Sequence, residues 1–426
     1  MSESQKSWGG ATLWDDLQRL IVDARTALAD LPKWEQPFHI FWLLGPFILL
    51  IERSPADAWL SILALVFAVR SLCQRDGVWL SHWWVRAAFI FWFVCLLSAS
   101  FSIVPTYALG EAISWFRFPL FAMATAFWLG RDKRLLYAML LSTGIGMMMM
   151  TGILTAEILF KYESQYELMR WRLTWPYGDL VPGSYLTKAG LPAFVVMVAL
   201  TFGARRKTSI LMGSLVSFSL AISVVAGERM NLIIRICACF LAGFSWRFNF
   251  RRSSVAVVMI LVVILSILVR QGGVEGRFTT GTLQELPIFA NSDYYRVMGG
   301  GIEAFLDYPL LGIGTGNYRI LCPEILAGID AFRCDNHPHN FYIQMLAETG
   351  AFGFLAGSFM IFTMVIAPFK ASRSNKNNVF AATAYIVPLG LFFPLQSTAD
   401  FFGQWHNIFL WSAVALSLAV AHREFD

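Results

Sequence analysis

Apolar runs close to the length that crosses a bilayer recur along the whole chain, and they constrain its fold more than any other feature. The chain is 57% hydrophobic and only 14% charged, whereas a soluble domain has roughly 25% charged residues. Because a spanning helix needs about 20 apolar residues, the sequence predicts an all-α polytopic membrane protein with about twelve transmembrane helices. The predicted spans are Phe38–Ile51, Ala56–Leu72, Val85–Ile103, Ala108–Leu129, Leu135–Phe160, Tyr185–Gly203, Ser209–Val225, Asn231–Trp246, Ser254–Val269, Asn340–Phe369, Val379–Leu395 and Trp405–Ala421.

The distribution of lysine and arginine predicts the orientation of these helices. Most of the 33 cationic residues fall in segments on the same side as the N-terminus, and cytoplasmic loops are enriched in such residues. We therefore expect both ends to be cytoplasmic and the net charge of +5 to report topology, with no nucleic-acid partner. The expected regions are a cytoplasmic segment 1–37, transmembrane helices 1–9 over 38–269, a periplasmic loop 270–339, helices 10–12 over 340–421 and a cytoplasmic tail 422–426.

Cations on the opposite, outer side are candidates for function, because the same bias removes lysine and arginine from outer loops. Apart from Arg53, which is near the first hairpin, they gather in three places: the loop 161–184, the turn 226–230 and the loop 270–339. Most are arginines, whose planar donors bind phosphate oxygens in pairs. The set is Lys161, Arg170, Arg172, Arg229, Arg270, Arg277, Arg296, Arg319 and Arg333. Three further cations, Arg117, Lys188 and Arg235, lie within predicted spans. We expect Arg117 to be structural, and Arg235 either to face a polar cavity or to pair internally.

The loop 270–339 is too long to lack structure of its own. An amphipathic pattern over residues 293–305 predicts a helix, and residues 308–318 form a turn that leads into a Gly-x-Gly-x-Gly bend. No predicted strand precedes this bend, which excludes a dinucleotide site. Tight turns over the membrane surface and backbone N–H groups that hold an anionic headgroup both remain open. Cys322 and Cys334 share this loop, and an oxidising compartment favours a disulfide between them.

Two histidines end the long loop, in the sequence Asn336-His337-Pro338-His339-Asn340. His339 stands at the start of the next span, where a helix N-terminus disfavours the imidazolium ion and keeps histidine able to accept a proton. The alternative is that both histidines cap the helix and bond backbone carbonyls. Within this span Glu348 must face protein or water, and Gly350, Gly353 and Gly357 allow close helix packing.

These residues carry a resemblance to a known family. His339-Asn340 followed after nine residues by Gly350, and then by Gly353, is similar to the histidine motif of the O-antigen ligase and polymerase superfamily of bacterial membrane glycosyltransferases. The segment 295–318 resembles the one that precedes the motif in that family. Gly227-Glu228-Arg229 resembles its short outer turn, although a small residue is commoner in place of Glu228.

The resemblance implies transfer of a glycan from an undecaprenyl-pyrophosphate carrier to an acceptor hydroxyl at the outer leaflet of the inner membrane. It implies inversion at the anomeric carbon and no metal or other cofactor. His339 would be the general base, and Arg229 and Arg296 would stabilise the departing diphosphate. Further substrate-binding candidates are Arg170, Arg172, Lys188, His337, Asn340 and Arg319, with Trp171, Trp175 and Tyr177 placed to stack on sugar rings.

Simpler interpretations of the same residues remain open. Arg229 could reach from a helix end to the membrane surface, Arg296 could pair with Asp293 on the surface, and Lys188 could pair with Asp179.

The acceptor is the remaining choice. A ligase uses lipid A–core, whereas a polymerase uses a second carrier-linked repeat unit. The single long outer loop favours a ligase. A lipid-linked glycan flippase or transporter is the less favoured alternative, since few charges lie within the spans and no internal repeat is visible.

Overall fold

The computed structural model describes residues 13–161, 173–179, 181–246 and 292–422, and within these ranges it contains helices and loops only. The helices are α1 Leu13–Asp30, α2 Gln36–Ile48, α3 Arg53–Gln74, η2 Val78–Ser81, α4 Trp83–Ser100, α5 Pro105–Trp115, α6 Arg117–Phe127, η3 Leu129–Arg131, α7 Lys133–Lys161, α8 Pro182–Ser184, η4 Tyr185–Ala189, α9 Leu191–Gly203, α10 Arg206–Val225, α11 Arg229–Ser245, α15 Asp293–Asp307, α16 Tyr318–Ile325, α17 Phe341–Ser374, α18 Val379–Thr383, α19 Ile386–Leu391 and α20 Trp405–Ala421.

Six helical segments in the described ranges are long and apolar enough to cross a membrane, or seven if Pro182–Ala189 (α8 and η4) and α9, bent by 62° from each other, count as one span. Helix α20 coincides with the predicted span Trp405–Ala421, and α2, with 13 residues, lies over most of the predicted span Phe38–Ile51. The predicted span Val379–Leu395 is divided into the short helices α18 and α19. The span predicted over Ser254–Val269 lies outside the described residues. The all-helical class is therefore confirmed, while the number of spans is not.

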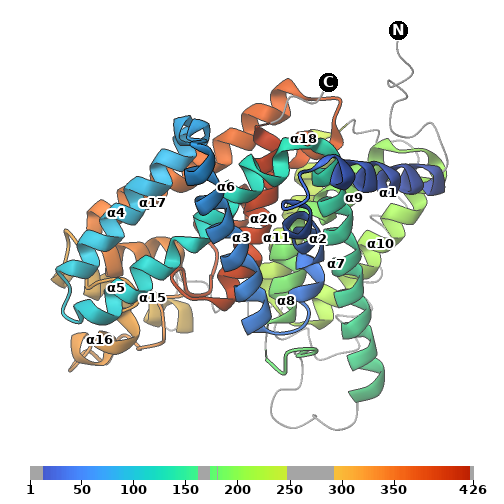
Figure 1. The fold of residues 1–426 in the computed structure, drawn as a ribbon. Coiled ribbons are helices and arrows are strands. Elements are labelled where there is room, and N and C mark those ends of the chain that lie inside the picture. The colour runs from blue at the N-terminus through green and yellow to red at the C-terminus, as the bar shows by residue number, and fades with distance from the viewer. Residues whose placement is uncertain (1–12, 162–172, 180, 247–291, 423–426) are drawn as a thin grey trace.

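The helices pack side by side in one layer, and α1 lies across one end of it (Figure 1). The central helix α20 packs against α6, and α4 packs along α17. Fully buried tryptophans fill the interior, among them Trp59, Trp115 and Trp411. Large apolar side chains on the outward faces of helices, such as Leu65 and Phe362, are more than half exposed. Such exposed apolar surface on long helices is typical of contact with lipid.

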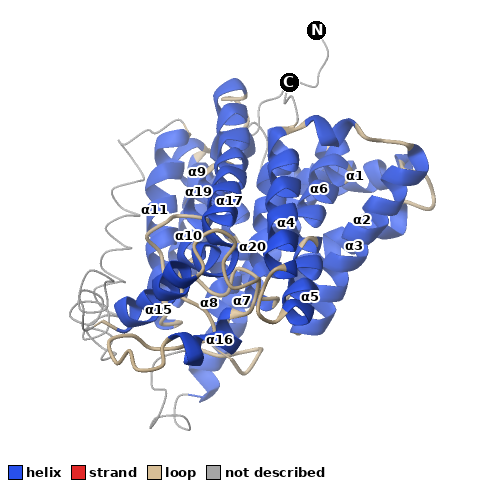
Figure 2. Ribbon diagram, turned by 90° about the vertical axis from the view of Figure 1, so that its left-hand side faces the viewer, coloured by secondary structure: helices blue, strands red, loops and turns tan. Residues whose placement is uncertain are grey.

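The layer has two faces, and α20 runs from one to the other. At its C-terminal end His422 accepts a hydrogen bond from Trp84 at 2.8 Å. Near that end Arg134 at the start of α7 pairs with Asp30 of α1 at 2.9 Å; we call this side the α1 face. The N-terminal end of α20 lies beside the loop that carries His339, on the side of α8, α15 and α16 (Figure 2); we call it the histidine face.

Helix α17 is broken at Gly350, which has φ 65° and ψ −167°. The chain around the glycine-rich bend is bonded to this break: Ile313 N–H donates to Ala347 O at 3.0 Å and Gly314 N–H donates to Glu348 O at 2.9 Å. Beyond the break, Ala351 N–H donates to Pro309 O at 2.9 Å. The predicted span Asn340–Phe369 thus corresponds to α17, and its break at Gly350 is a feature that the sequence did not predict. Because these N–H groups are used within the protein, the structure favours the structural interpretation of the bend over a headgroup site.

We expect Gly350→Ala to destabilise the protein by at least about 1–3 kcal/mol, because this backbone region is open almost only to glycine. The added Cβ would also overlap the carbonyl oxygen of Leu310. Thermal unfolding of the purified protein in detergent measures the loss. Gly110→Ala is the matched control, since Gly110 lies within α5 and its Cβ would meet no atom within 4 Å. An unfolding temperature unchanged by Gly350→Ala would contradict this account of the break.

Candidate functional site

The segment that carries the two histidines is fixed to the loop between α19 and α20, residues 392–404, which we call the strap. Thr398 N–H donates to His339 O at 2.8 Å. The Asn340 amide nitrogen donates to Pro394 O at 2.7 Å, while its oxygen caps α17 by accepting from Tyr342 N–H at 3.0 Å. Both ends of the Asn340 amide are thus used internally. We assign Asn340 to positioning of the histidine segment, although the sequence suggested it as a substrate ligand.

His339 forms a pair with Asp335, whose Oδ2 lies 3.2 Å from the imidazole Nε2. With the proton on Nε2, this contact is a hydrogen bond to the carboxylate and leaves the Nδ1 lone pair free to accept a proton. The backbone of His339 has φ 54°, a left-handed conformation that is uncommon outside glycine. The edge of the Tyr294 ring faces the imidazole, with 6.1 Å between ring centroids. A carboxylate-oriented histidine on a fixed loop is the usual arrangement of a general base.

His337 has a different role from His339. Its Nε2 lies 3.2 Å from Thr398 O, so it is bonded to the strap. Burial, together with the neighbouring charge of His339, lowers the pKa of His337 to about 4. The two imidazoles lie with 4.3 Å between their centroids. His337 is therefore a neutral donor to a backbone carbonyl near pH 7, which agrees with the alternative interpretation in which it bonds a carbonyl and not with a substrate ligand.

The carboxyl group of Asp335 is also shifted. Burial alone would raise its pKa, but the hydrogen bond from Asn336 N–H at 2.7 Å and the contact with His339 outweigh this effect. The pKa of Asp335 therefore lies below its usual value, and the side chain is a carboxylate at neutral pH.

We expect the folded protein to lose stability as the pH falls from about 6.5 to about 4. In this range the unfolded chain binds a proton at His337 and the folded chain does not, so protonation favours the unfolded state. Above pH 6.5 neither state binds this proton, and this loss of stability is absent. Thermal unfolding between pH 7 and pH 4 measures the slope. His337→Gln retains a donor for Thr398 and removes the titration, so its slope should be smaller; an equal slope would assign the effect to other groups.

The long loop is tied together beside this histidine pair. Cys322 and Cys334 form a disulfide, which confirms the sequence prediction. The predicted amphipathic helix is α15, and Arg333 N–H donates to Arg296 O on that helix at 3.1 Å. Asp293 pairs with Arg333 at 3.1 Å. The ion pair considered between Asp293 and Arg296 is therefore not formed. The Arg296 guanidinium donates to Asp330 O at 3.3 Å and is partly exposed on the histidine face.

The turn that precedes α11 is bonded to α8 and lies in electrostatic reach of η4. Glu228 accepts a hydrogen bond from Gly183 N–H at 3.0 Å, which fixes the turn to α8. Its charge also acts on Lys188 of η4. His406, near the start of α20, has Lys188 and His337 as electrostatic neighbours. His406 therefore lies within electrostatic reach of both η4 and the histidine segment. Arg229, the residue after the turn, begins α11. The structure does not describe the Arg229 side chain.

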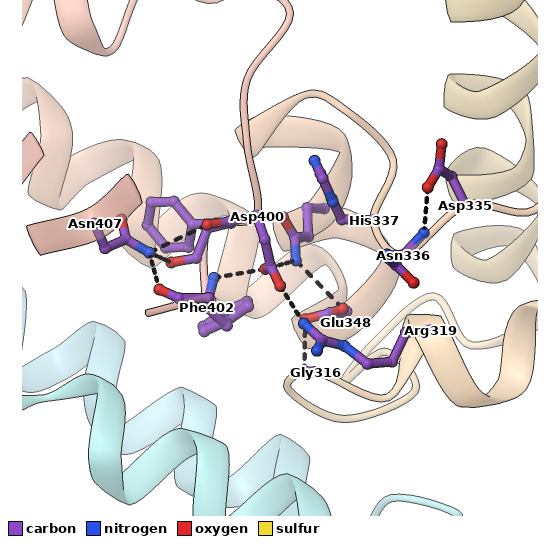
Figure 3. Close-up of polar contacts among 12 residues, drawn as sticks. Gly316, Arg319, Asp335, Asn336, His337, Glu348, Asp400, Phe402 and Asn407 are labelled. Carbon is purple, nitrogen blue, oxygen red and sulfur yellow. Dashed lines mark hydrogen bonds and ion pairs between the residues drawn. The ribbon is translucent and has the colours of Figure 1, made fainter. Parts of the chain in front are cut away.

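Asp400 organises the other side of the histidine segment (Figure 3). Its Oδ1 accepts from Gln344 Nε2 at 2.6 Å and from Phe402 N–H at 2.9 Å, and its Oδ2 pairs with Arg319. Glu348, which is 1% exposed, accepts from Gly316 N–H at 2.7 Å. The prediction that Glu348 faces protein is confirmed. Arg319 of α16, a predicted substrate ligand, is thereby paired with an acid of the strap.

Other sequence candidates have separate outcomes. Arg170, Arg172 and Trp171 lie outside the described residues. Tyr177 donates to Leu49 O at 2.7 Å and packs against Trp405, so it is part of the interior. Arg117 pairs with Asp57 at 3.0 Å, as a structural residue would. Arg235 pairs internally: it is fully buried, donates to Ser219 and Ser223 and lies over the Phe194 ring.

Sequence reasoning missed Asp335, Asp400 and His406. Asp335 is one of several acids scattered through the loop, and its position four residues before His339 is the signal that could have found it. Asp400 and His406 are separated from the histidine segment by more than 55 residues in the sequence, and no local pattern announces their contacts. In the described part of the chain, no group of three or more His, Cys, Asp or Glu side chains is arranged to hold a metal ion.

A comparison with protein families finds a match to the model described as O-antigen ligase over residues 193–356. The matched region includes the turn before α11, the helix α15, the glycine-rich bend, the histidine segment and the break in α17. No curated protein matches the chain.

Proposed function

We propose that this chain, which belongs to the O-antigen ligase superfamily, transfers O-antigen polysaccharide from undecaprenyl pyrophosphate to a sugar hydroxyl of lipid A–core. Enzymes of this family are glycosyltransferase-like and use lipid-linked glycans in a membrane. The observation that carries the proposal is the Asp335–His339 pair, which lies within the matched region and is fixed by the strap. Its free imidazole nitrogen can take the proton of an attacking hydroxyl group.

The proposed reaction is a single displacement. The acceptor oxygen attacks the anomeric carbon of the donor as the bond to the diphosphate oxygen breaks, and the electron pair leaves with the carrier diphosphate. Nδ1 of His339 accepts the hydroxyl proton, and Asp335 stabilises the imidazolium ion that forms. Arg229 and Arg296 would stabilise the developing negative charge on the diphosphate. Attack from the opposite side inverts the anomeric carbon. We expect no metal or nucleotide requirement, since the diphosphate is already an activated leaving group.

The proposed location is the bacterial inner membrane, with both termini cytoplasmic and the site at the periplasmic face. Long apolar helices support the membrane assignment. The cationic side chains of the α1 face include Arg70, Arg131 and Arg134, which form ion pairs with acids on that face. Their excess there supports a cytoplasmic α1 face. The histidine face is then periplasmic, where lipid A–core and the carrier-linked glycan meet.

A transfer assay with the purified protein tests the proposal. The donor is a glycan on undecaprenyl pyrophosphate, and lipid A–core and a second carrier-linked unit are offered separately as acceptors. We expect glycan attached to lipid A–core, with unchanged activity in EDTA. Polymer formation without attachment to the core would assign the alternative, an O-antigen or exopolysaccharide polymerase. Movement of the donor across vesicles without any new glycosidic bond would assign a flippase.

A further inference from the structure

A polar cavity of about 390 Å³ opens beside the strap, which supplies part of its lining. Its lining comes from α3, α5, α16, the start of α6 and the strap. The charged and amide side chains that line it are Arg53, Asp57, Glu111, Arg117, Arg319 and Gln404. Its volume lies within the range of about 300–1,000 Å³ that is typical of ligand sites. Polar groups this dense at the end of apolar helices need either internal partners or a ligand.

Internal pairing leaves unused arginine N–H donors in the cavity. Arg117 pairs with Asp57, and Arg319 pairs with Asp400. Arg53 is in no ion pair among the described residues; its guanidinium donates to the neutral amide oxygen of Gln404 at 2.5 Å. The Arg53 charge is offset by the carboxylate of Glu111 in the same lining, but each of the three guanidinium groups of Arg53, Arg117 and Arg319 retains N–H donors that these contacts do not use. A phosphate group would accept from such donors, because arginine binds its oxygens in pairs.

The cavity also presents hydrogen-bond acceptors, which a bare phosphate ion would not use. Glu111 has Tyr107 as a hydrogen-bond partner, and its side chain lies against Gly316 and at the cavity wall. A carboxylate accepts several hydrogen bonds, and adjacent hydroxyl groups of a sugar ring supply such donors. The mixture of arginines and a carboxylate therefore suits a molecule with both phosphate and hydroxyl groups.

Helices that line the cavity and the helix that begins with Arg229 lie on opposite sides of the molecule. Helix α11, which begins with Arg229, and helices α3 and α5 flank the α17 and α20 pair from opposite sides (Figure 2). The strap connects the two regions, because Thr398 bonds both histidines while Asp400 bonds Arg319. A substrate in the cavity would thus approach His339 from the side opposite the donor diphosphate.

We propose that this cavity, through Arg53, Arg319 and Glu111, binds a phosphorylated sugar of the acceptor glycolipid. The assignment to an acceptor rests on the proposed function, whereas binding of a phosphorylated sugar does not. Occupation of the cavity would hold the strap and the acceptor hydroxyl beside His339.

Binding to the full-length protein in phosphatidylcholine nanodiscs tests the site. The probes are a hexose phosphate, the unphosphorylated hexose and inorganic phosphate, followed by saturation-transfer NMR. We expect the hexose phosphate to bind at least about tenfold more tightly than either control. Arg53→Gln should weaken the affinity for the hexose phosphate about tenfold, because it removes one charge-assisted hydrogen bond. Arg86→Gln, on the α1 face, is the matched control. Equal binding of hexose and hexose phosphate, or normal binding by Arg53→Gln, would overturn the site.

Transfer kinetics test the acceptor assignment separately. With a phosphorylated acceptor, Arg53→Gln should raise the acceptor KM about tenfold, with the loss on KM and not on kcat. With a phosphatase-treated acceptor, Arg53→Gln should raise the acceptor KM little further, because the two changes remove the same interaction. Two results together would instead assign the cavity to a lipid headgroup. They are an acceptor KM that Arg53→Gln leaves unchanged, and loss of hexose phosphate binding when the nanodiscs contain phosphatidylglycerol. Intact binding without any transfer by the wild-type protein would reject the proposed function and leave the cavity site standing.

Discussion

Asp335→Asn is expected to lower kcat for glycan transfer by about 10²–10⁴-fold, with smaller changes in the KM of donor and acceptor. The carboxylate of Asp335 accepts from Nε2 of His339 over 3.2 Å and so keeps Nδ1 unprotonated. The asparagine amide can instead donate to Nε2, which moves the proton to Nδ1 and removes the base. It also removes the negative charge that stabilises the imidazolium ion.

A double-variant comparison separates this role from a structural one. His339→Ala alone should lower kcat as much as Asp335→Asn, and the two together should be no worse than His339→Ala, because the residues act as one unit. Asp293→Asn is the matched control, since Asp293 is an exposed acid of the same loop that pairs with Arg333. Additive losses, or normal transfer by a folded His339→Ala variant, would remove the histidine from the mechanism.

The sequence predicted the parts of the site that depend on local patterns. Amphipathic periodicity placed α15, the cysteine pair was correctly joined, and His339 was placed at the helix start by its position before an apolar run. Each of these features depends on residues close together in the chain. The predicted span Val379–Leu395 was less accurate, because this segment divides into α18 and α19, and α19 contains Pro388 and Gly390.

What the sequence could not supply were contacts between distant segments. The break in α17 arises because the chain around the glycine-rich bend supplies hydrogen bonds to residues on both sides of Gly350. The strap holds the histidines from about 60 positions away, through Thr398. Arg53 stood apart from the other outer cations in the sequence, and only the packing of α3 against the strap brings it to the same cavity as Arg319.

Arg296→Ala is expected to lower kcat by about 10²–10³-fold, the usual effect of removing one group that stabilises charge in a transition state. Arg296 lies on α15, whose backbone is bonded to the histidine loop through Arg333 N–H. Its guanidinium makes a 3.3 Å bond to the Asp330 carbonyl, which orients it and leaves other N–H donors for the diphosphate. Arg296→Lys keeps the charge and loses the paired donors, so it should restore only part of the rate.

Leaving-group dependence distinguishes this role from simple support of the loop. The wild-type protein should strongly prefer a diphosphate donor to the matching monophosphate donor, since the guanidinium acts on charge that develops on the leaving group. Arg296→Ala should reduce that preference, whereas a variant that only loosens the loop slows both donors alike. Arg86→Ala on the α1 face controls for the loss of an arginine from the protein. An unchanged ratio between the two donors in Arg296→Ala would reassign this residue to the structure of the loop.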